Sequence, residues 1–528
     1  MANAASVMKV SPPRSARKGK ERRELLEKLR ESRASEFVFA VVGYAGSGTS
    51  FVATRLGRFL DKKGYTPHDI KARDFLDTFA SRRGMKYSGA DARSLDRTAF
   101  YQSVGDTFRQ ESSEYGIVAG FMASRIKELR DQNQGKKNVY ILDSLKHPDE
   151  VELLRHVYGS NFVLVGVGCR PDIRRSRLAT KYGIDEAKVD DIKALDEFVS
   201  RDAEDSENKY GQQVNDTFHR SDFFVDNTKS TEDAKNFTLP EQLKRLDEIV
   251  FRRDLYRPNK DERGMYYAQA AALRSSCLSR QVGASILDLK GNLLAVGTNE
   301  VPKAFGGAYS DGDSLDDRCY KKGYCSNTVR QNDIVQDIFD RLQKAKQLSV
   351  GVELKDVEKV LKKTRVKSLI EFSRAVHAEM DALLTLVRSG TILGEGATLY
   401  STTYPCHSCA RHIVAAGVSQ VVYLEPYSKS LAIDLHRDSI ADNLPEEESV
   451  GRVRFVPYQG VSPRLYEEVF AKRTDLKDSA TGKFDFIPEN QFKNIERSLW
   501  TKTYIEFEEE IEQFIAGILD DEGDDGAA

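Results

Sequence analysis

The sequence predicts an α/β protein with two sheet-containing units in 528 residues. From about residue 36 to 227, short apolar runs alternate with long helical patterns, which is typical of a mostly parallel sheet covered by helices. A polar segment with Pro240 and Pro258 follows, and a second alternation of helices and strands begins near residue 263. A chain of this length favours two or three domains, each large enough for its own core.

The first unit is expected to contain five strands with helices between them. Helical segments lie between the strands, such as FVATRLGRFLDKKG, which follows the first strand and a glycine-rich stretch, and SVGDTFRQESSEYGIVAGFMASRIKELR. The strands are predicted in EFVFAVVG, HDIKARDFL, NVYILDS, NFVLVGVGC and SDFFVDN.

The second unit opens with the helix MYYAQAAALRSSCLSR and the hairpin VGASILDLKGNLLAVGTN. A polar insertion over residues 301–367 carries helical pieces such as NDIVQDIFDRLQKAKQL. The unit continues with a helix, a strand, a helix and a strand in EFSRAVHAEMDALLTLVRSG, ATLYSTT, HSCARHIVAAG and QVVYLEP. The predicted organisation is a basic tail, a first domain, a linker with one helix, a second domain and an extension with an acidic tail, over residues 1–35, 36–230, 231–262, 263–470 and 471–528.

The composition argues against several classes of protein. A formal net charge of −2 with 31% charged residues gives no overall attraction to nucleic acid or to a membrane surface. No apolar run approaches the roughly eighteen residues of a membrane-spanning helix, and the N-terminus lacks the apolar core of a secretory signal. We therefore expect a cytoplasmic protein whose six cysteines are metal ligands or free thiols rather than disulfides.

The strongest chemical signal has two halves. Glu379 follows His377 by two residues, and Cys406 and Cys409 lie three residues apart after Pro405. Cysteines at this spacing share a helical face, so both sulfurs can reach one zinc ion, and three protein ligands leave its fourth position open to water. Zinc lowers the pKa of such a water, and Glu379 could carry a proton from it to a substrate nitrogen. H-x-E followed by P-C-x-x-C is the signature of zinc-dependent nucleobase deaminases.

A structural zinc knuckle is the alternative interpretation of this motif. It would need a fourth protein ligand, for which His407 and His412 are available. A closed structural site has no use for a carboxylate at Glu379, so the order and spacing of the two halves favour deamination.

Residues 265–427 resemble the cytidine deaminase superfamily and, within it, the deoxycytidylate deaminases. Beside the zinc motif, the likeness includes RSSCLSR over 274–280, VGA over 282–284 and GTNEVP over 297–302. The resemblance implies an α/β/α sandwich, zinc as cofactor and deoxycytidine nucleotides as substrates. It also implies a reaction in which an activated water attacks C4 of cytosine and ammonia leaves.

The same resemblance suggests residues that bind the substrate. In that family the asparagine of G-x-N-x-x-P helps to hold the sugar and the base, and Asn299 is the matching residue. Tyr404 is a candidate for the base pocket, and Arg280, Tyr427 and Lys429 are candidates for phosphate binding. Plainer interpretations stay open, because Asn is common in turns, a strand-end Tyr often packs in the core, and Lys and Arg are usually solvated.

Three further cysteines, Cys277, Cys319 and Cys325, lie outside the zinc motif. Some deoxycytidylate deaminases carry a second, structural zinc, which these cysteines could bind. Free thiols are the alternative, because no fourth ligand is evident.

The stretch GYAGSGTS, between the first strand and the first helix, is nearly a phosphate-binding loop. In the pattern G-x-x-x-x-G-K-S/T, backbone N–H groups hold phosphates, the hydroxyl serves Mg²⁺ and the lysine neutralises the terminal phosphates. Thr49 occupies the lysine position here, which argues against phosphoryl transfer unless Arg55 or Lys71 substitutes. We expect a nucleotide, with or without Mg²⁺, at Gly43, Gly46, Ser47, Gly48, Thr49, Ser50 and Asp143.

Two more features resemble a P-loop kinase-like fold. Asp143 ends an apolar strand, where such proteins place an acidic residue near the phosphates or the metal. A later strand is followed by a cluster of arginines that resembles the lid of small-molecule kinases, namely Arg170, Arg174, Arg175 and Arg177. The first domain is therefore expected to be a P-loop kinase-like parallel sheet.

The whole arrangement, over about residues 36–470, resembles the bacterial anti-phage deoxycytidine-nucleotide deaminases. The resemblance implies that dCTP or dCMP is converted to the uracil nucleotide, which drains the pool that phage replication needs, and that the chain forms a homo-oligomer. We expect the first domain to bind a regulatory nucleotide; an inhibitory RNA or protein partner is not readable from the sequence. A bifunctional nucleotide-salvage kinase–deaminase and a nucleic-acid cytidine deaminase that docks through the basic tail stay open as alternatives.

Overall fold

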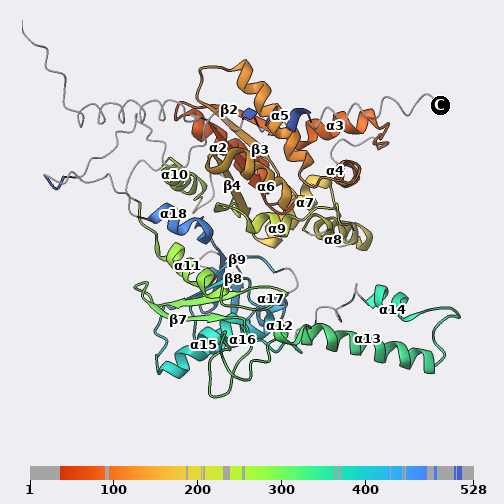
Figure 1. Cartoon of the computed structure of the whole chain (residues 1–528), viewed down its shortest axis with the longest axis vertical. Helices are drawn as coiled ribbons and strands as arrows, with labels where there is room; N and C mark the ends of the chain where they lie inside the picture. Colours follow the sequence, from red (N-terminus) through yellow and green to blue (C-terminus); the bar gives the residue numbers. More distant parts are fainter. Residues whose placement is uncertain are drawn as a thin grey trace, which may run out of the picture.

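A computed structural model gives the arrangement of the two units (Figure 1). It describes residues 36–471, except 90–93, 186–187, 204, 206–207, 230–237, 252–255, 362–363, 365, 367–368, 370, 428–429, 443 and 445–447, and beyond these 481–483, 505–506, 508–509 and 511–513. The basic tail and the acidic C-terminal tail that the sequence predicts lie outside these residues. Within the described ranges, every helix is too short or too polar to cross a membrane.

The first sheet has six strands in the order β12-β5-β4-β1-β3-β2. Five of them are parallel, as predicted, and the short β12 pairs antiparallel with β5 at the edge. The strands are β1 (Phe37–Val42), β2 (Thr66–Lys71), β3 (Asn138–Asp143), β4 (Phe162–Gly168), β5 (Phe223–Asp226) and β12 (Gly460–Val461).

Helices cover both faces of this sheet, and alternate residues of the strands enter two separate cores. The helices are α2 (Thr49–Asp61), α3 (Ala72–Arg82), α4 (Leu95–Ser112), α5 (Ile117–Gln132), α6 (Pro148–Tyr158), α7 (Pro171–Tyr182), α8 (Val189–Ala203), α9 (Val214–His219) and α10 (Leu239–Val250). The long helix predicted across residues 103–130 is wrong in one respect, because Ser113 adopts a left-handed φ of 55° and divides it into α4 and α5.

Two segments outside the predicted first domain contribute to the first core. Helix α10, which the sequence assigns to a linker, buries Leu239, Leu243 and Leu246 against the sheet. Helix α18 (Tyr466–Phe470) and β12 fall in the range predicted for the second domain, yet Val461 and Phe470 are buried in the same core. The two units are therefore joined by more than the chain between them.

The second sheet has the order β10-β11-β9-β8-β6-β7. Strand β6 is antiparallel to β7 and β8, as expected for the predicted hairpin, and β8, β9, β11 and β10 are mutually parallel. The strands are β6 (Gly283–Leu287), β7 (Leu293–Thr298), β8 (Thr398–Thr403), β9 (Gln420–Glu425), β10 (Ile440–Asp442) and β11 (Val453–Pro457).

Helices cover both faces of the second sheet as well, so the predicted fold class is confirmed. Helix α11 (Lys260–Ala272) packs on one face, and Tyr400 of β8 points into that core. Helices α15 (Ala378–Ser389) and α16 (His407–Ala415) pack on the other face, where Leu399 of β8 is buried. A further helix of the unit, α17 (Ala432–His436), packs against α16.

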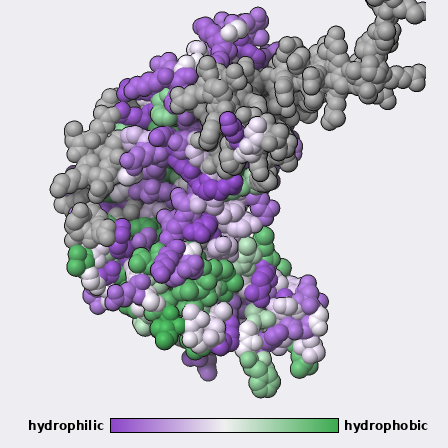
Figure 2. All heavy atoms as spheres, turned by 90° about the vertical axis from the view of Figure 1, so that its left-hand side faces the viewer, coloured by the Kyte–Doolittle hydropathy of each residue, from purple (hydrophilic) through white to green (hydrophobic). Residues whose placement is uncertain are grey.

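The insertion carries α12 (Cys319–Lys322), α13 (Ser326–Lys344) and α14 (Leu354–Leu361), of which the sequence predicts α13. Figure 1 shows α13 and α14 projecting away from the second sheet. On the face shown in Figure 2, hydrophilic residues dominate the upper unit, whereas hydrophobic residues gather on the lower one. Exposed Leu289 and Leu293 belong to the β6–β7 hairpin of that lower unit.

Candidate active site and nucleotide cavity

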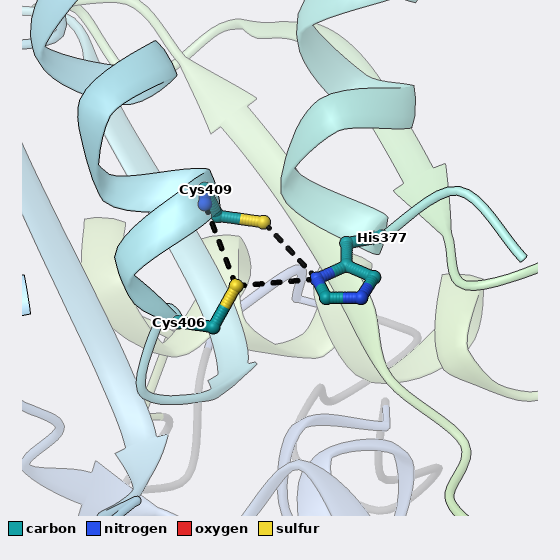
Figure 3. Close-up of side chains that lie close together, drawn as sticks. All are labelled: His377, Cys406 and Cys409. Carbon is teal, nitrogen blue, oxygen red and sulfur yellow. Dashed lines mark hydrogen bonds between the residues drawn. The ribbon is translucent and has the colours of Figure 1, made fainter. Parts of the chain in front are cut away.

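Three potential metal ligands converge where two helices begin beside the second sheet (Figure 3). His377 is the N-cap residue of α15, and Cys406 is the N-cap residue of α16. The Cys406 sulfur accepts a hydrogen bond from the backbone N–H of Cys409 over 3.4 Å, and both sulfurs point towards the imidazole. Because helix N-termini attract negative charge, this position favours thiolates.

The spacing of the ligand atoms fits a zinc ion. Nδ1 of His377 lies 3.4 Å from the Cys406 sulfur and 3.3 Å from the Cys409 sulfur. A tetrahedral zinc with ordinary Zn–N and Zn–S bonds would separate such atoms by about 3.6 Å. A hydrogen bond from the Cys409 thiol lowers the pKa of Cys406 to about 4, which provides a thiolate ligand. The site therefore has the atoms, the spacing and the charge that zinc requires.

Glu379 completes the site from the first turn of α15. Its side chain is only 4% exposed, and the Cys409 sulfur lies 3.5 Å from its Oε2 atom. Burial raises the pKa of this carboxyl, which suits a group that accepts a proton and returns it.

The predicted alternative ligands do not join the cluster. Among the described residues, the one group of three or more His, Cys, Asp or Glu that could hold a metal consists of His377, Cys406 and Cys409, without His407 or His412. Three protein ligands leave a tetrahedral zinc one position for water or substrate, which favours a catalytic over a structural site.

Comparison with known proteins decides the family. The model of the family "Cytidine and deoxycytidylate deaminase zinc-binding region" matches residues 258–425. The deoxycytidylate deaminase of Enterobacteria phage T2 is 30% identical over 165 residues, which are 31% of this chain and 78% of the phage protein. The chain belongs to the cytidine and deoxycytidylate deaminase family. The deoxycytidylate deaminase of Saccharomyces cerevisiae is 28% identical over 173 residues, 33% of this chain and 40% of the yeast protein.

Two solved structures each resemble part of this deaminase-family chain. One is the dCMP deaminase of cyanophage S-TIM5 in complex with dCMP and dUMP, with a TM-score of 0.23, 20% identity, and coverage of 38% of this chain and 99% of that one. The other is shikimate kinase of Acinetobacter baumannii in complex with shikimate, with a TM-score of 0.24, 10% identity, and coverage of 42% of this chain and 96% of that one.

Asn299 and Arg280, two predicted substrate contacts, lie together at the edge of the deaminase unit. The Asn299 side chain is fixed by the backbone, because its amide donates to the Arg280 carbonyl and its Oδ1 accepts from the Val282 N–H, both over 2.7 Å. The Arg280 guanidinium pairs with Glu425 over 2.7 Å. Asn299 therefore shapes the segment that carries Arg280, and substrate contact by either side chain stays a prediction.

The predicted tyrosines differ in their surroundings. Tyr404 is buried in the core of the deaminase unit, with its ring centroid 4.7 Å from Tyr423 and 5.5 Å from Phe455. Tyr427 is only partly buried, and burial together with the nearby Cys406 raises its pKa. Tyr427 is thus more exposed than Tyr404, which packs in the core. Lys429 lies outside the described residues.

The second predicted metal site is not assembled. Cys277, Cys319 and Cys325 form no metal-binding group with other residues of the described part of the chain. The Cys319 sulfur instead lies 3.8 Å from the Ser326 hydroxyl. Cys319 begins α12 and Cys325 is the N-cap residue of α13.

The glycine-rich loop joins β1 to α2, as predicted for a phosphate-binding loop. Gly46 and Gly48 adopt φ values of 81° and 84°, which favour glycine, and Gly48 is the N-cap residue of α2. The Ser47 carbonyl accepts a hydrogen bond from the Asn227 side chain over 2.8 Å. Gly43, at the start of the loop, has no room for a Cβ atom beside the Ser47 side chain.

The loop opens onto a cavity of about 420 Å³ that is lined by the ends of β2 and β3 and by helices α3, α4, α7 and α8. Thr49 and Ser50 line it, and the Ser50 hydroxyl donates to Oδ2 of Asp143 over 2.6 Å. Burial raises the pKa of the Asp143 carboxyl, whereas its bond to Ser50 lowers it. A hydroxyl beside a carboxylate at a phosphate loop is an arrangement that can hold Mg²⁺.

The arginines of the predicted lid are engaged with neighbouring groups. Arg177 donates to the carbonyl groups of Asn227 and Thr228 over 2.8 and 3.0 Å, and the Arg174 guanidinium lies 5.0 Å from the centroid of the Tyr44 ring. Arg170 and Arg175 pair with nearby aspartates of the described chain. In this structure helix α7 therefore contacts the glycine-rich loop.

Sequence reasoning missed one cluster that links the two units. His219, the last residue of α9, has its Nδ1 3.2 Å from Oε1 of Glu425 and its Nε2 3.3 Å from the Arg280 guanidinium. Burial lowers the pKa of His219 to about 3 and raises that of Glu425 to about 7. Residues 219, 280 and 425 belong to no shared local pattern, so only the fold reveals the contact.

Proposed function

We propose that the protein is a zinc-dependent deaminase that converts dCMP, dCTP or both to dUMP or dUTP. The observation that carries this proposal is the convergence of His377, Cys406 and Cys409 with the buried carboxyl of Glu379. The relatives in phage T2 and yeast support the substrate class, since both carry the name deoxycytidylate deaminase.

The residues of the site suit hydrolytic deamination. Zinc at His377, Cys406 and Cys409 would supply Lewis-acid activation of a water molecule. Glu379 would accept a proton from this water and deliver it to the amino nitrogen on C4 of cytosine. The C4–N bond breaks, C4 gains a carbonyl oxygen and N3 of the ring gains the second proton of the water, so that one water is consumed and one ammonia is released. The low exposure of Glu379 keeps this proton away from bulk solvent.

The proposal is tested by following products by mass spectrometry after incubation with dCMP, dCTP, cytidine nucleotides, adenine nucleotides and single-stranded nucleic acids. We expect uracil nucleotides from the deoxycytidine nucleotides, and loss of product after chelation of zinc or in Glu379→Ala. Product that persists in Glu379→Ala would overturn the mechanism. Product from nucleic acid alone would favour the nucleic-acid alternative.

We propose a regulatory role for the first unit, because contacts connect the phosphate loop to the deaminase site. The ring centroid of Tyr44, within the loop, lies 5.5 Å from that of Phe218. The next residue, His219, contacts Glu425 and Arg280. The Glu425 carbonyl accepts a 2.7 Å hydrogen bond from the N–H of Tyr404, two residues before Cys406. A nucleotide on the loop could thus alter the position of Arg280 and of α16.

This regulatory role predicts that a nucleotide changes the deamination rate without being consumed. Gly48→Asp should remove the response, because the aspartate would overlap the Asn227 side chain, carry φ of +84° and repel phosphate. An unchanged response of Gly48→Asp to every nucleotide would contradict the role. Consumption of ATP with a nucleotide acceptor would instead favour the bifunctional kinase–deaminase.

In a cell, the proposed activity would deplete deoxycytidine nucleotides, and we propose defence against phage as its purpose. The support is the resemblance in domain arrangement over residues 36–470. Bacteria that express the wild-type protein should release fewer phage than bacteria with Glu379→Ala. Equal phage yields would contradict the defence role and leave the chemistry untouched. The proposed homo-oligomer is checked separately by light scattering.

A further inference from the structure

The cavity beside the phosphate loop retains a positively charged wall although the loop has lost its lysine. Thr49 occupies the lysine position and lines the cavity. Four cationic side chains line the same cavity, namely Lys71, Arg73, Lys146 and Lys181. Arg55, the other candidate to replace the lysine, is not among the lining residues, and its guanidinium lies 5.1 Å from the centroid of the Phe51 ring.

Three of these four cations already have partners. The Lys146 ammonium pairs with Oδ1 of Asp202 over 2.7 Å. Lys181 donates to the Tyr182 hydroxyl over 3.0 Å, and the Arg73 guanidinium lies 4.9 Å from the centroid of the Tyr101 ring. Within the described chain, the exposed Lys71 ammonium has neither an ion pair nor a hydrogen bond. Lys71 is thus the cavity cation that is available to a ligand.

Lys71 also lies at the end of the cavity where a metal and the terminal phosphates would bind. It is the last residue of β2 and pairs in register with Asp143, the last residue of β3. Asp143 in turn accepts the hydrogen bond from Ser50, the residue that would serve a divalent cation. The charge of Lys71 therefore lies beside the place where the terminal phosphates of a loop-bound nucleotide would meet the metal.

A second observation suits a ligand that carries more than phosphate groups. Gln102 lines it from α4, is only 5% exposed, and its Oε1 has no hydrogen-bond partner in the described structure. A buried amide oxygen without a partner costs free energy unless a ligand donor reaches it. This atom suits an N–H or O–H group of a base or a sugar.

We propose that Lys71 takes over the phosphate-binding charge of the missing loop lysine, without its part in phosphoryl transfer, and makes this cavity a site for a nucleoside triphosphate with a divalent cation. The inference rests on the proposed regulatory role and specifies its ligand. A triphosphate gains most from Lys71, because its terminal phosphate carries the charge that the ammonium can neutralise. A diphosphate would bind the loop backbone and gain less.

The test is isothermal titration of the full chain with Mg²⁺ and each of the eight common ribo- and deoxyribonucleoside triphosphates, followed by the diphosphate of the tightest binder. Binding that Gly48→Asp leaves intact is assigned to the deaminase site and subtracted. For the remaining binding, Lys71→Ala should lower the affinity for the triphosphate about tenfold or more and that for the diphosphate much less. Lys71→Arg should restore most of the preference, and Lys62→Ala, on the exposed end of α2, should change nothing.

The outcomes separate this inference from the regulatory role. If Lys71→Ala keeps the wild-type ratio of triphosphate to diphosphate affinity, the inference on Lys71 is wrong while nucleotide binding stands. If the wild-type protein binds both nucleotides equally, the assignment to triphosphates is wrong. If Gly48→Asp removes no binding of any nucleotide, both the inference and the regulatory role are contradicted. Circular dichroism of Lys71→Ala confirms that the variant is folded.

Discussion

The proposed metal binding and the proposed proton transfer are assigned to different side chains of the site. Cys409 faces His377, whereas Glu379 is buried behind the sulfur and is not part of the ligand group. We predict that Cys409→Ser loses both zinc and activity. Glu379→Gln should keep about one zinc per chain but lose about 10³-fold in kcat, because the proton carrier is absent. Zinc content by plasma emission and kcat with dCMP and dCTP measure the two effects.

Glu395→Gln is the matched control for this pair, because Glu395 is exposed on the loop after α15. It should retain both zinc and activity. If Glu379→Gln loses zinc as completely as Cys409→Ser, the carboxylate is a ligand and the division of roles is wrong.

Sequence reasoning identified single residues well where the signal is local. His377, Cys406 and Cys409 are recognisable because zinc demands particular residue types at helix spacing. The surroundings of Arg280 and Tyr404 were not predictable. A guanidinium can pair with many carboxylates, and a strand-end tyrosine can face either side, so only the three-dimensional fold selects Glu425 and the core of the deaminase unit as their neighbours.

At the scale of elements, the close packing of α15 on the second sheet depends on a glycine. A Cβ atom at Gly297 of β7 would overlap backbone atoms of Ala378 and Ala382 in α15. We predict that Gly297→Ala lowers the free energy of unfolding by about 1–3 kcal/mol and reduces zinc content, because α15 carries His377 at its start. Chemical denaturation and metal analysis provide the measurements.

Gly394→Ala is the control for the close packing of α15. A Cβ atom at Gly394 meets no heavy atom within 4 Å, and its φ is not in the left-handed region. This variant should match the wild type in the free energy of unfolding and in zinc content. Equal effects of the two substitutions would mean that close packing at Gly297 does not position the helix.

The end of α9 makes the stability of the molecule depend on pH. Burial lowers the pKa of His219 to about 3, below its value of about 6.5 in an unfolded chain, so its contribution is present above pH 6.5 and is lost as the pH falls. Between pH 7.5 and 5.5 the wild type should therefore lose about 1.4 kcal/mol in the free energy of unfolding through this group. His219→Gln should avoid that loss.

Urea denaturation at both pH values measures the difference between wild type and His219→Gln. Glu425 acts in the opposite sense. Burial raises its pKa to about 7, so its contribution to the free energy of unfolding is lost as the pH rises towards 7. This contribution is expected in both the wild type and His219→Gln. His156→Gln, at an exposed position, should follow the wild type. If His219→Gln shows the same pH dependence as the wild type, His219 is not held neutral at the contact.

At the scale of the whole molecule, the two sheets and their helices were predictable, but their connections were not. Alternating strands and helices have periodicities that the sequence displays directly. Strand β12 has two residues, and its pairing with β5 spans more than two hundred positions, so no local pattern announces it. The buried Glu508, which pairs with Arg130 and accepts a hydrogen bond from Tyr158, is a second such connection between distant parts of the chain.

Because of these connections, we predict that a substitution in α18 destabilises the first unit. Phe470 is 8% exposed and lies in the core formed by β1, β5 and α10. Phe470→Ala should cost about 3–5 kcal/mol in that core and accelerate hydrogen exchange in β5 and α10, with little change in β8 and α15. Val450→Ala, at a side chain that is 81% exposed, should leave exchange unchanged in both units. Faster exchange confined to the second unit would show that α18 stabilises the deaminase fold instead, and would place the boundary between the units after residue 470.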